Sequence, residues 1–235
     1  MGFLGQLSTE AFARLVATLG EVPSAYYRKV GPCPNPTHMD AVGGSMRTLP
    51  TCPLCGGCGE LFKVMPIPLT GPTGGKVVCQ QAMVGTRRYP FVVQGGEVVC
   101  TFLETEYPFH DGDRIALSTR PDTVDITYER ETGDPVDRLM YTPVTEILTV
   151  YRGDTLTEVT TGFQPSEDGL GIQWTGTAPV KGTMITLVYR YDTTWAILGG
   201  SQHRRVRATN GDVFPSRVLM AKWMQRDSDR APGFL

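Results

Sequence analysis

Hydrophobic residues near the start of the chain recur at the spacing of one helix face, which predicts an amphipathic helix over residues 8–19. The apolar residues of this face are Phe12, Leu15, Val16 and Leu19. Ser8 or Thr9 can cap the free amides of the first turn, and Gly20 suits the position just after a helix. We expect the apolar face to pack on the body of the protein, with a neighbouring subunit as the alternative.

The next part of the chain, up to residue 118, predicts a first series of β-strands. Short apolar runs alternate there with turns rich in Gly, Pro and Asp, such as residues 71–75 and 111–113. The predicted strands cover residues 61–68, 76–84, 89–93, 97–104 and 114–118. Strands this short and closely spaced indicate a small β-barrel or sandwich.

A second β series follows, and the break between the two series is marked by residues 120–122 and by a polar turn at residues 131–135. Its strands are predicted over residues 124–128, 146–151, 156–160, 171–174, 184–191 and 195–198. Side chains partly alternate between two faces in residues 183–191. The members of the face expected to be buried are Ile185, Leu187, Tyr189 and Tyr191. A strand ending in Trp174, polar turns and an aromatic-rich last strand together predict an Ig-like sandwich.

Together these patterns predict a mainly β protein divided into four consecutive segments. Residues 1–60 hold the helix and a loop rich in Cys, while residues 61–120 form the small barrel or sandwich. Residues 121–200 form the Ig-like sandwich, and residues 201–235 form a basic C-terminal extension. Within that extension we expect a short helix over residues 218–224. No linker between the segments is long enough to imply independent domains.

Composition supports a folded β protein and argues against some functions. The 235 residues are 40% hydrophobic and 20% charged, and 27 glycines and 18 prolines punctuate the short apolar runs. The formal net charge of −2 argues against a protein that binds nucleic acid through a large basic field. No stretch reaches the ~18–20 apolar residues of a transmembrane helix, and the first residues lack the pattern of a signal peptide. We therefore expect no membrane association and synthesis in a reducing cytosol.

Four of the six cysteines gather in an N-terminal segment rich in Gly and Pro, and they predict a structural zinc site. Cys52 and Cys55 form a Cys-x-x-Cys turn followed by glycine, which directs two thiolates at one centre. Cys33 is the third expected ligand. His38 is favoured for the fourth position, and Cys58 competes with it. A reduced, metal-free loop is the alternative, whereas a catalytic zinc would rely on His and carboxylate ligands.

Residues 52–59 read CPLCGGCG and resemble the Cys-Pro-x-Cys-x-Gly-x-Gly element of the J-domain co-chaperone zinc domain. In that register Cys58 falls on a variable position rather than on a ligand. The resemblance covers these residues alone and occurs once. It implies the geometry of a zinc knuckle and nothing about chaperone activity.

The remaining two cysteines, Cys79 and Cys100, each end an apolar run. They could pair across adjacent strands. Because we expect synthesis in a reducing cytosol, two buried thiols are the favoured interpretation.

The sequence predicts no catalytic constellation. A nucleophilic triad needs a histidine, and the three in the chain are His38, His110 and His203. His38 is assigned to the metal, and His110 lies in a predicted turn without a Gly-x-Ser-x-Gly elbow. Residues 71–76 read GPTGGK, but Val77 breaks the pattern of a phosphate-binding loop. We therefore expect a protein without enzymatic activity.

A recognisable order of motifs runs through the second β series. The motifs are residues 141–150, 160–163, 171–174, 178–183 and 187–191. This order, with a Cys/His knuckle near the amino terminus, resembles structural proteins of tailed-bacteriophage virions. The resemblance is to the neck or collar components between head and tail of long-tailed phages, and it covers residues 30–200.

The resemblance implies a homo-oligomeric, ring-forming virion component that contacts other phage structural proteins and is assembled in the host bacterial cytoplasm. The virion channel carries DNA, so we expect Arg204, Arg205 and Arg207 to contact packaged DNA or a partner. Two other classes stay open. One is a zinc-dependent nucleic-acid-binding module, and the other is an enzyme that uses the metal.

Overall fold

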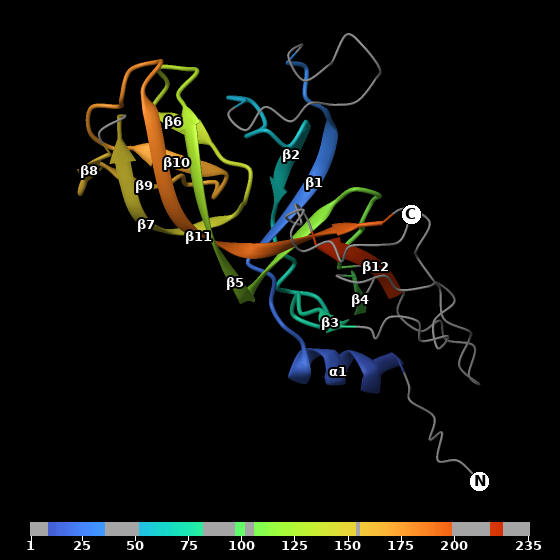
Figure 1. Cartoon of the computed structure of the whole chain (residues 1–235). Coiled ribbons are helices and arrows are strands. Elements are labelled where there is room, and N and C mark those ends of the chain that lie inside the picture. Colours follow the sequence, from blue (N-terminus) through green and yellow to red (C-terminus); the bar gives the residue numbers. More distant parts are fainter. Residues whose placement is uncertain are drawn as a thin grey trace, which may run out of the picture. The chain divides into compact units, whose positions relative to one another are not determined.

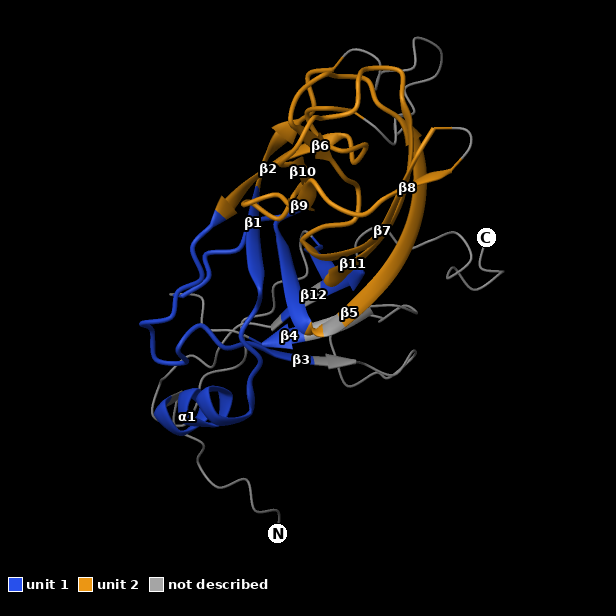
Figure 2. Ribbon diagram, turned by 90° about the vertical axis from the view of Figure 1, so that its left-hand side faces the viewer, with its two compact units in different colours: residues 1–28, 65–118, 194–235 blue, residues 29–64, 119–193 orange. Residues whose placement is uncertain are grey.

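The computed structural model describes residues 9–35, 52–81, 97–101, 106–153, 156–198 and 217–222. Within these ranges the chain forms one helix and twelve strands, which confirms the predicted mainly β class (Figure 1). Its residues group into two compact units (Figure 2). Unit 1 comprises residues 1–28, 65–118 and 194–235, and unit 2 comprises residues 29–64 and 119–193.

The two units are interleaved along the chain, whereas the sequence predicts four consecutive segments. That division into segments stays a prediction, and so do the small barrel and the Ig-like sandwich. None of the sheets that the described residues form is closed into a barrel. Over the same residues, no helix has the length and hydrophobicity needed to cross a membrane.

Unit 1 is built on antiparallel strand pairs. Its strands are β1 (Ala25–Pro32), β3 (Val78–Gln81), β4 (Glu97–Thr101), β5 (Arg114–Glu129), β11 (Met184–Ile197) and β12 (Arg217–Lys222). The strand β1 pairs with β5, β11 pairs with β12, β12 with β4, and β4 with β3. Three of these strands, β1, β5 and β11, continue into unit 2. The buried core of unit 1 consists of Tyr26, Val77, Cys100, Tyr107, Phe109, Ile115, Leu117, Trp195, Ile197, Val218 and Met220.

The helix α1 (Thr9–Leu19) belongs to unit 1 and confirms the predicted helix over its described residues. Val16 is buried, but Leu15 and Leu19 are 48% and 68% exposed, so only part of the predicted apolar face packs on the unit. Gly20 donates its amide to the Val16 carbonyl at 2.7 Å and ends the helix. A Cβ at Gly20 would lie 2.5 Å from that oxygen, so glycine is required there.

Unit 2 contains the remaining strands. They are β2 (Glu60–Met65), β6 (Val136–Arg138), β7 (Val144–Arg152), β8 (Thr157–Val159), β9 (Phe163–Pro165) and β10 (Gly171–Trp174). The strand β7 lies between β11 and β8, while β10 lies between β6 and β9 in a separate three-stranded sheet. The buried core consists of Val124, Tyr128, Leu139, Val144, Val150, Ile172, Trp174, Ile185, Leu187, Tyr189 and Tyr191.

The alternation predicted for residues 183–191 is confirmed. Ile185, Leu187, Tyr189 and Tyr191 are all buried in β11, on the face that the sequence predicts. Side chains of one strand alternate between two faces, so these four pack into one core.

Two predictions about local structure are wrong. The break predicted at residues 120–122 lies inside the continuous strand β5, where Pro121 is exposed. The helix predicted at residues 218–224 is replaced over its described part by the strand β12. Val218 and Met220 are both fully buried, which is the spacing of two that places side chains on the core face of a strand.

Candidate metal centre

A tight turn between β1 and β2 carries three of the four clustered cysteines, and we call residues 52–59 the knuckle. The Gly56 amide donates to the Cys52 carbonyl at 2.8 Å, and the Cys58 amide donates to the Cys55 carbonyl at 3.3 Å. Gly56, Gly57 and Gly59 all have positive φ, at 61°, 90° and 74°. Side chains are strained in this region of backbone conformation, so the three glycines let the chain fold back on itself.

The fourth clustered cysteine, Cys33, follows directly after β1. Its amide donates to the Gly59 carbonyl at 2.9 Å. Gly59 is the last residue before β2, and β2 is the neighbour of β1 in the sheet. The pairing of the two strands therefore brings Cys33 to the knuckle, although Cys33 and Cys52 are 19 positions apart in the sequence.

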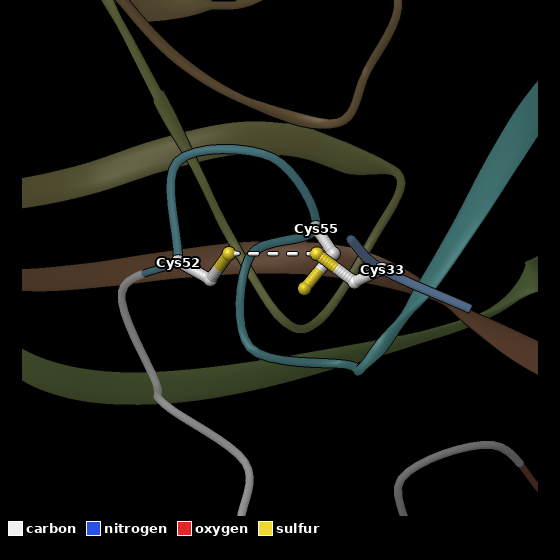
Figure 3. A group of neighbouring side chains, drawn as sticks. All are labelled: Cys33, Cys52 and Cys55. Carbon is white, nitrogen blue, oxygen red and sulfur yellow. Dashed lines mark hydrogen bonds between the residues drawn. The ribbon is translucent and has the colours of Figure 1, made fainter. Parts of the chain in front are cut away.

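The sulfurs of Cys33, Cys52 and Cys55 all lie within 4.8 Å of one another (Figure 3). The Cys33 and Cys52 sulfurs are 3.8 Å apart, and all three residues are free thiols. A tetrahedral zinc ion with Zn–S bonds of about 2.3 Å separates its ligand sulfurs by about 3.8 Å. The three side chains could therefore hold a metal ion with little rearrangement.

Polar groups around the sulfurs favour their charged form. The Gly59 amide donates to the Cys55 sulfur at 3.3 Å, and the Asn35 side-chain amide donates to the Cys52 sulfur at 3.3 Å. Without a metal, the hydrogen bond with Cys58 and burial raise the pKa of the Cys55 thiol well above its usual range. A cation bound by the three sulfurs would replace the protons and be supported by both amide donors.

Cys58 contacts both the Cys55 side chain and a backbone carbonyl. Its sulfur donates to the Glu60 carbonyl at 3.0 Å, and it is not a member of the group of three. The sequence favoured His38 as the fourth metal ligand, with Cys58 as the alternative. His38 lies outside the described residues, as do Arg204, Arg205 and Arg207.

The knuckle is fixed to the rest of unit 2 by close backbone contact. Gly56 lies against Leu139, whose side chain is part of the buried core. Pro53, next to Cys52, helps to line a small cavity together with Tyr128, Arg130 and Asp137. Thus the candidate metal ligands are attached to the core of unit 2 and not to a free-standing loop.

A buried polar network forms the wall of that cavity. Asp137 accepts hydrogen bonds from Arg130 Nε at 2.9 Å, from the Tyr128 hydroxyl at 3.0 Å and from Trp174 Nε1 at 2.9 Å. Arg130 is 1% exposed and Asp137 is 5% exposed. Burial, together with the negative charge of Asp137, raises the pKa of Tyr128 well above its usual range. The network satisfies buried polar groups, which makes it a structural element of the unit.

Sequence reasoning missed two residues around the candidate centre. The Asn35 side chain donates a hydrogen bond to the Cys52 sulfur, and Leu139 contacts Gly56 of the knuckle. Asn35 lies two residues after Cys33, and this short separation is the feature of the sequence that could have indicated a contact with the cluster. Nothing in the sequence relates Leu139 to the knuckle, because that contact depends on the tertiary fold.

Other residues that the sequence singled out are placed as follows. The His110 side chain is 63% exposed, in agreement with the predicted turn, and its backbone amide donates to Asp113. Cys79 and Cys100 are free thiols on adjacent strands. Cys100 is buried, and Cys79 is half-buried.

The chain was also compared with known proteins. Its sequence matches no protein-family model and no curated protein.

Proposed function

We propose that this chain is a non-enzymatic structural component of a tailed-phage virion, a ring-forming neck or collar protein with one structural zinc ion in its knuckle. The virion assignment is supported by the order of strand and turn motifs over residues 141–191, which resembles that of neck and collar proteins. The observation that carries the zinc site is the cluster of Cys33, Cys52 and Cys55. Its three sulfurs come from the end of β1 and from the knuckle, and they lie within 4.8 Å of one another.

Zinc is the metal that best suits the cluster. Thiolates are soft ligands that favour zinc, copper(I) and iron–sulfur clusters over magnesium or calcium. A Cys-x-x-Cys turn with an amide donating to one sulfur and a third thiolate from a neighbouring strand end is typical of a structural zinc site. Both features are present, in the Gly59 amide at Cys55 and in Cys33 after β1.

The surroundings of the cluster support a structural role. A set of four protein ligands would leave no open position on the metal for water, whereas catalytic zinc sites keep an open position and a nearby acid or base. Glu60 is the carboxylate closest to the knuckle in sequence, and it forms an ion pair with Lys29. Such a pairing occupies the group that would otherwise serve as a general base.

His38 is the proposed fourth ligand. Cys58 is engaged with the Glu60 carbonyl at 3.0 Å, so using it would require that bond to be given up. His38 follows Cys33 by five positions, and three cysteines with one imidazole nitrogen are an established ligand set of structural zinc sites. The resulting site would be of the Cys₃His type.

The zinc ion would fasten the start of β2 to the end of β1. The knuckle itself buries little apolar surface, since Leu54 at its tip is 52% exposed. Metal ligation supplies the stabilisation that a hydrophobic core would otherwise give such a loop. A subunit of a ring needs rigid edges to contact its neighbours, and the zinc site would make this edge rigid.

Native mass spectrometry of the full chain, purified without chelator, tests the proposal. We expect a closed ring of identical subunits with one zinc per subunit, and release of the metal only when the protein unfolds. A metal-free monomer would overturn the proposal. A zinc-bearing monomer that binds DNA with strong salt sensitivity would overturn the virion assignment in favour of a nucleic-acid-binding module.

A further inference from the structure

A second pair of cysteines lies in unit 1, away from the candidate metal ligands in sequence. Cys79 in β3 and Cys100 in β4 are direct partners in the antiparallel register. Their sulfurs are 3.2 Å apart, and both are free thiols. Direct cross-strand partners point to the same face of a sheet, so both side chains face the same core.

The surroundings of the two thiols differ in a way that matters for reactivity. Cys100 is fully buried and belongs to the core of unit 1, whereas Cys79 is half-buried and packs against the edge of that core. Among the described residues, no third cysteine, histidine or carboxylate joins them in a group that could hold a metal. Metal ligation therefore does not account for the pair.

We propose that Cys79 and Cys100 are a redox-modification site, at which the folded protein forms an intramolecular disulfide by exchange with a low-molecular-weight disulfide such as oxidised glutathione. Cross-strand partners have Cα atoms about 4.5–5.5 Å apart, which lies within the range of about 4.4–6.8 Å found in disulfides. The backbone of β3 and β4 is thus already placed for the bond. The inference is independent of the proposed function, because it depends on the geometry of these two strands.

The exchange proceeds in two balanced steps. The Cys79 thiolate attacks one sulfur of oxidised glutathione, forms a mixed disulfide and releases one glutathione thiolate. Cys100 then loses its proton to solvent, attacks the Cys79 sulfur and releases the second glutathione thiolate. The two protein thiols lose two electrons in total, and one molecule of oxidised glutathione becomes two molecules of the reduced form.

Accessibility and acidity set the order of these steps. Cys79 is the more accessible member of the pair, and a hydrogen bond with Cys79 together with complete burial raises the pKa of the Cys100 thiol. Cys79 therefore attacks oxidised glutathione first, and deprotonation of Cys100 limits the second step. The rate of bond formation should rise with pH.

The test uses the full chain as purified. The protein is incubated with oxidised glutathione, the remaining thiols are alkylated with N-ethylmaleimide, and tryptic peptides are analysed by mass spectrometry. Cleavage at Arg87 and Arg88 separates the peptide with Cys79 from the peptide with Cys100. We expect the two peptides to be linked, and the melting temperature to rise by about 5–10 °C because the bond closes a loop.

Matched variants make the outcome decisive. In Cys100→Ser the glutathione adduct on Cys79 should accumulate, and in Cys79→Ser the buried Cys100 should stay unmodified while the protein is folded. Cys58→Ser should leave the linkage intact. Alkylation of both Cys79 and Cys100 after oxidation would overturn the inference, and so would a stable glutathione adduct on Cys79 of the unaltered protein.

Discussion

Gly56 in the knuckle and Leu139 in the core of unit 2 are in backbone contact. A Cβ built on Gly56 would lie 2.4 Å from the Leu139 carbonyl oxygen and 2.6 Å from its carbonyl carbon. These atoms belong to the main chain, so they cannot rotate away as a flexible side chain would. The position of the Cys52-x-x-Cys55 turn is therefore set by a contact that only glycine permits.

We expect Gly56→Ala to lower the free energy of unfolding by about 2–4 kcal/mol, since the new methyl group meets the Leu139 backbone and the residue has a φ of +61°. Urea denaturation measures this. Gly153→Ala is the matched control, because Gly153 has a φ of +74° and no atom within 4 Å of the added Cβ. It should lose only about 1–2 kcal/mol. Equal losses in the two variants would show that the Leu139 contact is unimportant.

The proposed ligand set predicts a clear ranking of zinc contents. Cys33→Ser and Cys52→Ser should lose bound zinc, because each removes a thiolate of the three-sulfur cluster. His38→Ala should weaken zinc binding by tenfold or more, and Cys58→Ser should retain one zinc per chain. Competition with a chromophoric chelator gives the affinities, and Cys79→Ser controls for the loss of a thiol elsewhere. Zinc loss in Cys58→Ser with retention in His38→Ala would reverse the assignment of the fourth ligand.

Removing the Asp137 carboxylate should destabilise unit 2 strongly. In Asp137→Ala the buried Arg130 guanidinium would lose its counterion, which typically costs about 3–5 kcal/mol. The Trp174 indole would also lose its acceptor, so its fluorescence should change in the native state. Glu146→Gln is the control, because it removes an exposed pair with Arg190 and should change stability by less than about 1 kcal/mol. A loss below about 1 kcal/mol in Asp137→Ala would contradict the expectation.

Alkaline pH should destabilise unit 1 through Tyr26. Burial, opposed by the hydrogen bond from Arg28 and assisted by the charge of Asp113, raises the pKa of Tyr26 to about 12. The unfolded chain then loses this proton from about pH 10 and the folded chain only near pH 12. The stabilisation from neutral Tyr26 is present below pH 10 and is lost as pH rises through 12.

Tyr26→Phe separates this effect from other alkaline changes. The variant should be about 1 kcal/mol less stable at pH 7, because it loses the hydrogen bond to Asp113. Its disadvantage should shrink between pH 10 and pH 12, measured as urea midpoints across that range. Tyr151→Phe, at a half-buried tyrosine of β7, controls for the loss of a phenol hydroxyl. A difference that stays constant with pH would argue against the role of Tyr26.

Local patterns in the sequence predicted the parts of the fold that local interactions determine. The helix α1 followed from its spacing, and the buried face of β11 followed from the alternation of Ile185, Leu187 and Tyr189. The spacing of Cys52 and Cys55 likewise predicted that their sulfurs lie close together, and the two are within 4.8 Å of each other. In each case the residues that determine the structure lie within one turn or one strand.

Long-range features were harder to predict. Tyr26 and Tyr27 are both buried, so β1 breaks the alternation by which a strand is recognised, and it was not predicted. Residues 120–122 were interpreted as a break between two β series, yet β5 continues through them. A proline is tolerated in a strand at a position where no backbone amide donor is needed. Whether a donor is needed depends on the pairing partners and not on the sequence nearby.

The interleaving of the two units restricts how recombination between genes can exchange parts of such a protein. The chain passes from one unit to the other within β1, β2, β5 and β11, so every crossing lies inside a strand. The shortest continuous stretch that contains all of unit 2 runs from residue 29 to residue 193, and it includes residues 65–118 of unit 1. Recombination that swaps one contiguous piece of the gene therefore cannot transfer unit 2 alone. The two units should be inherited together.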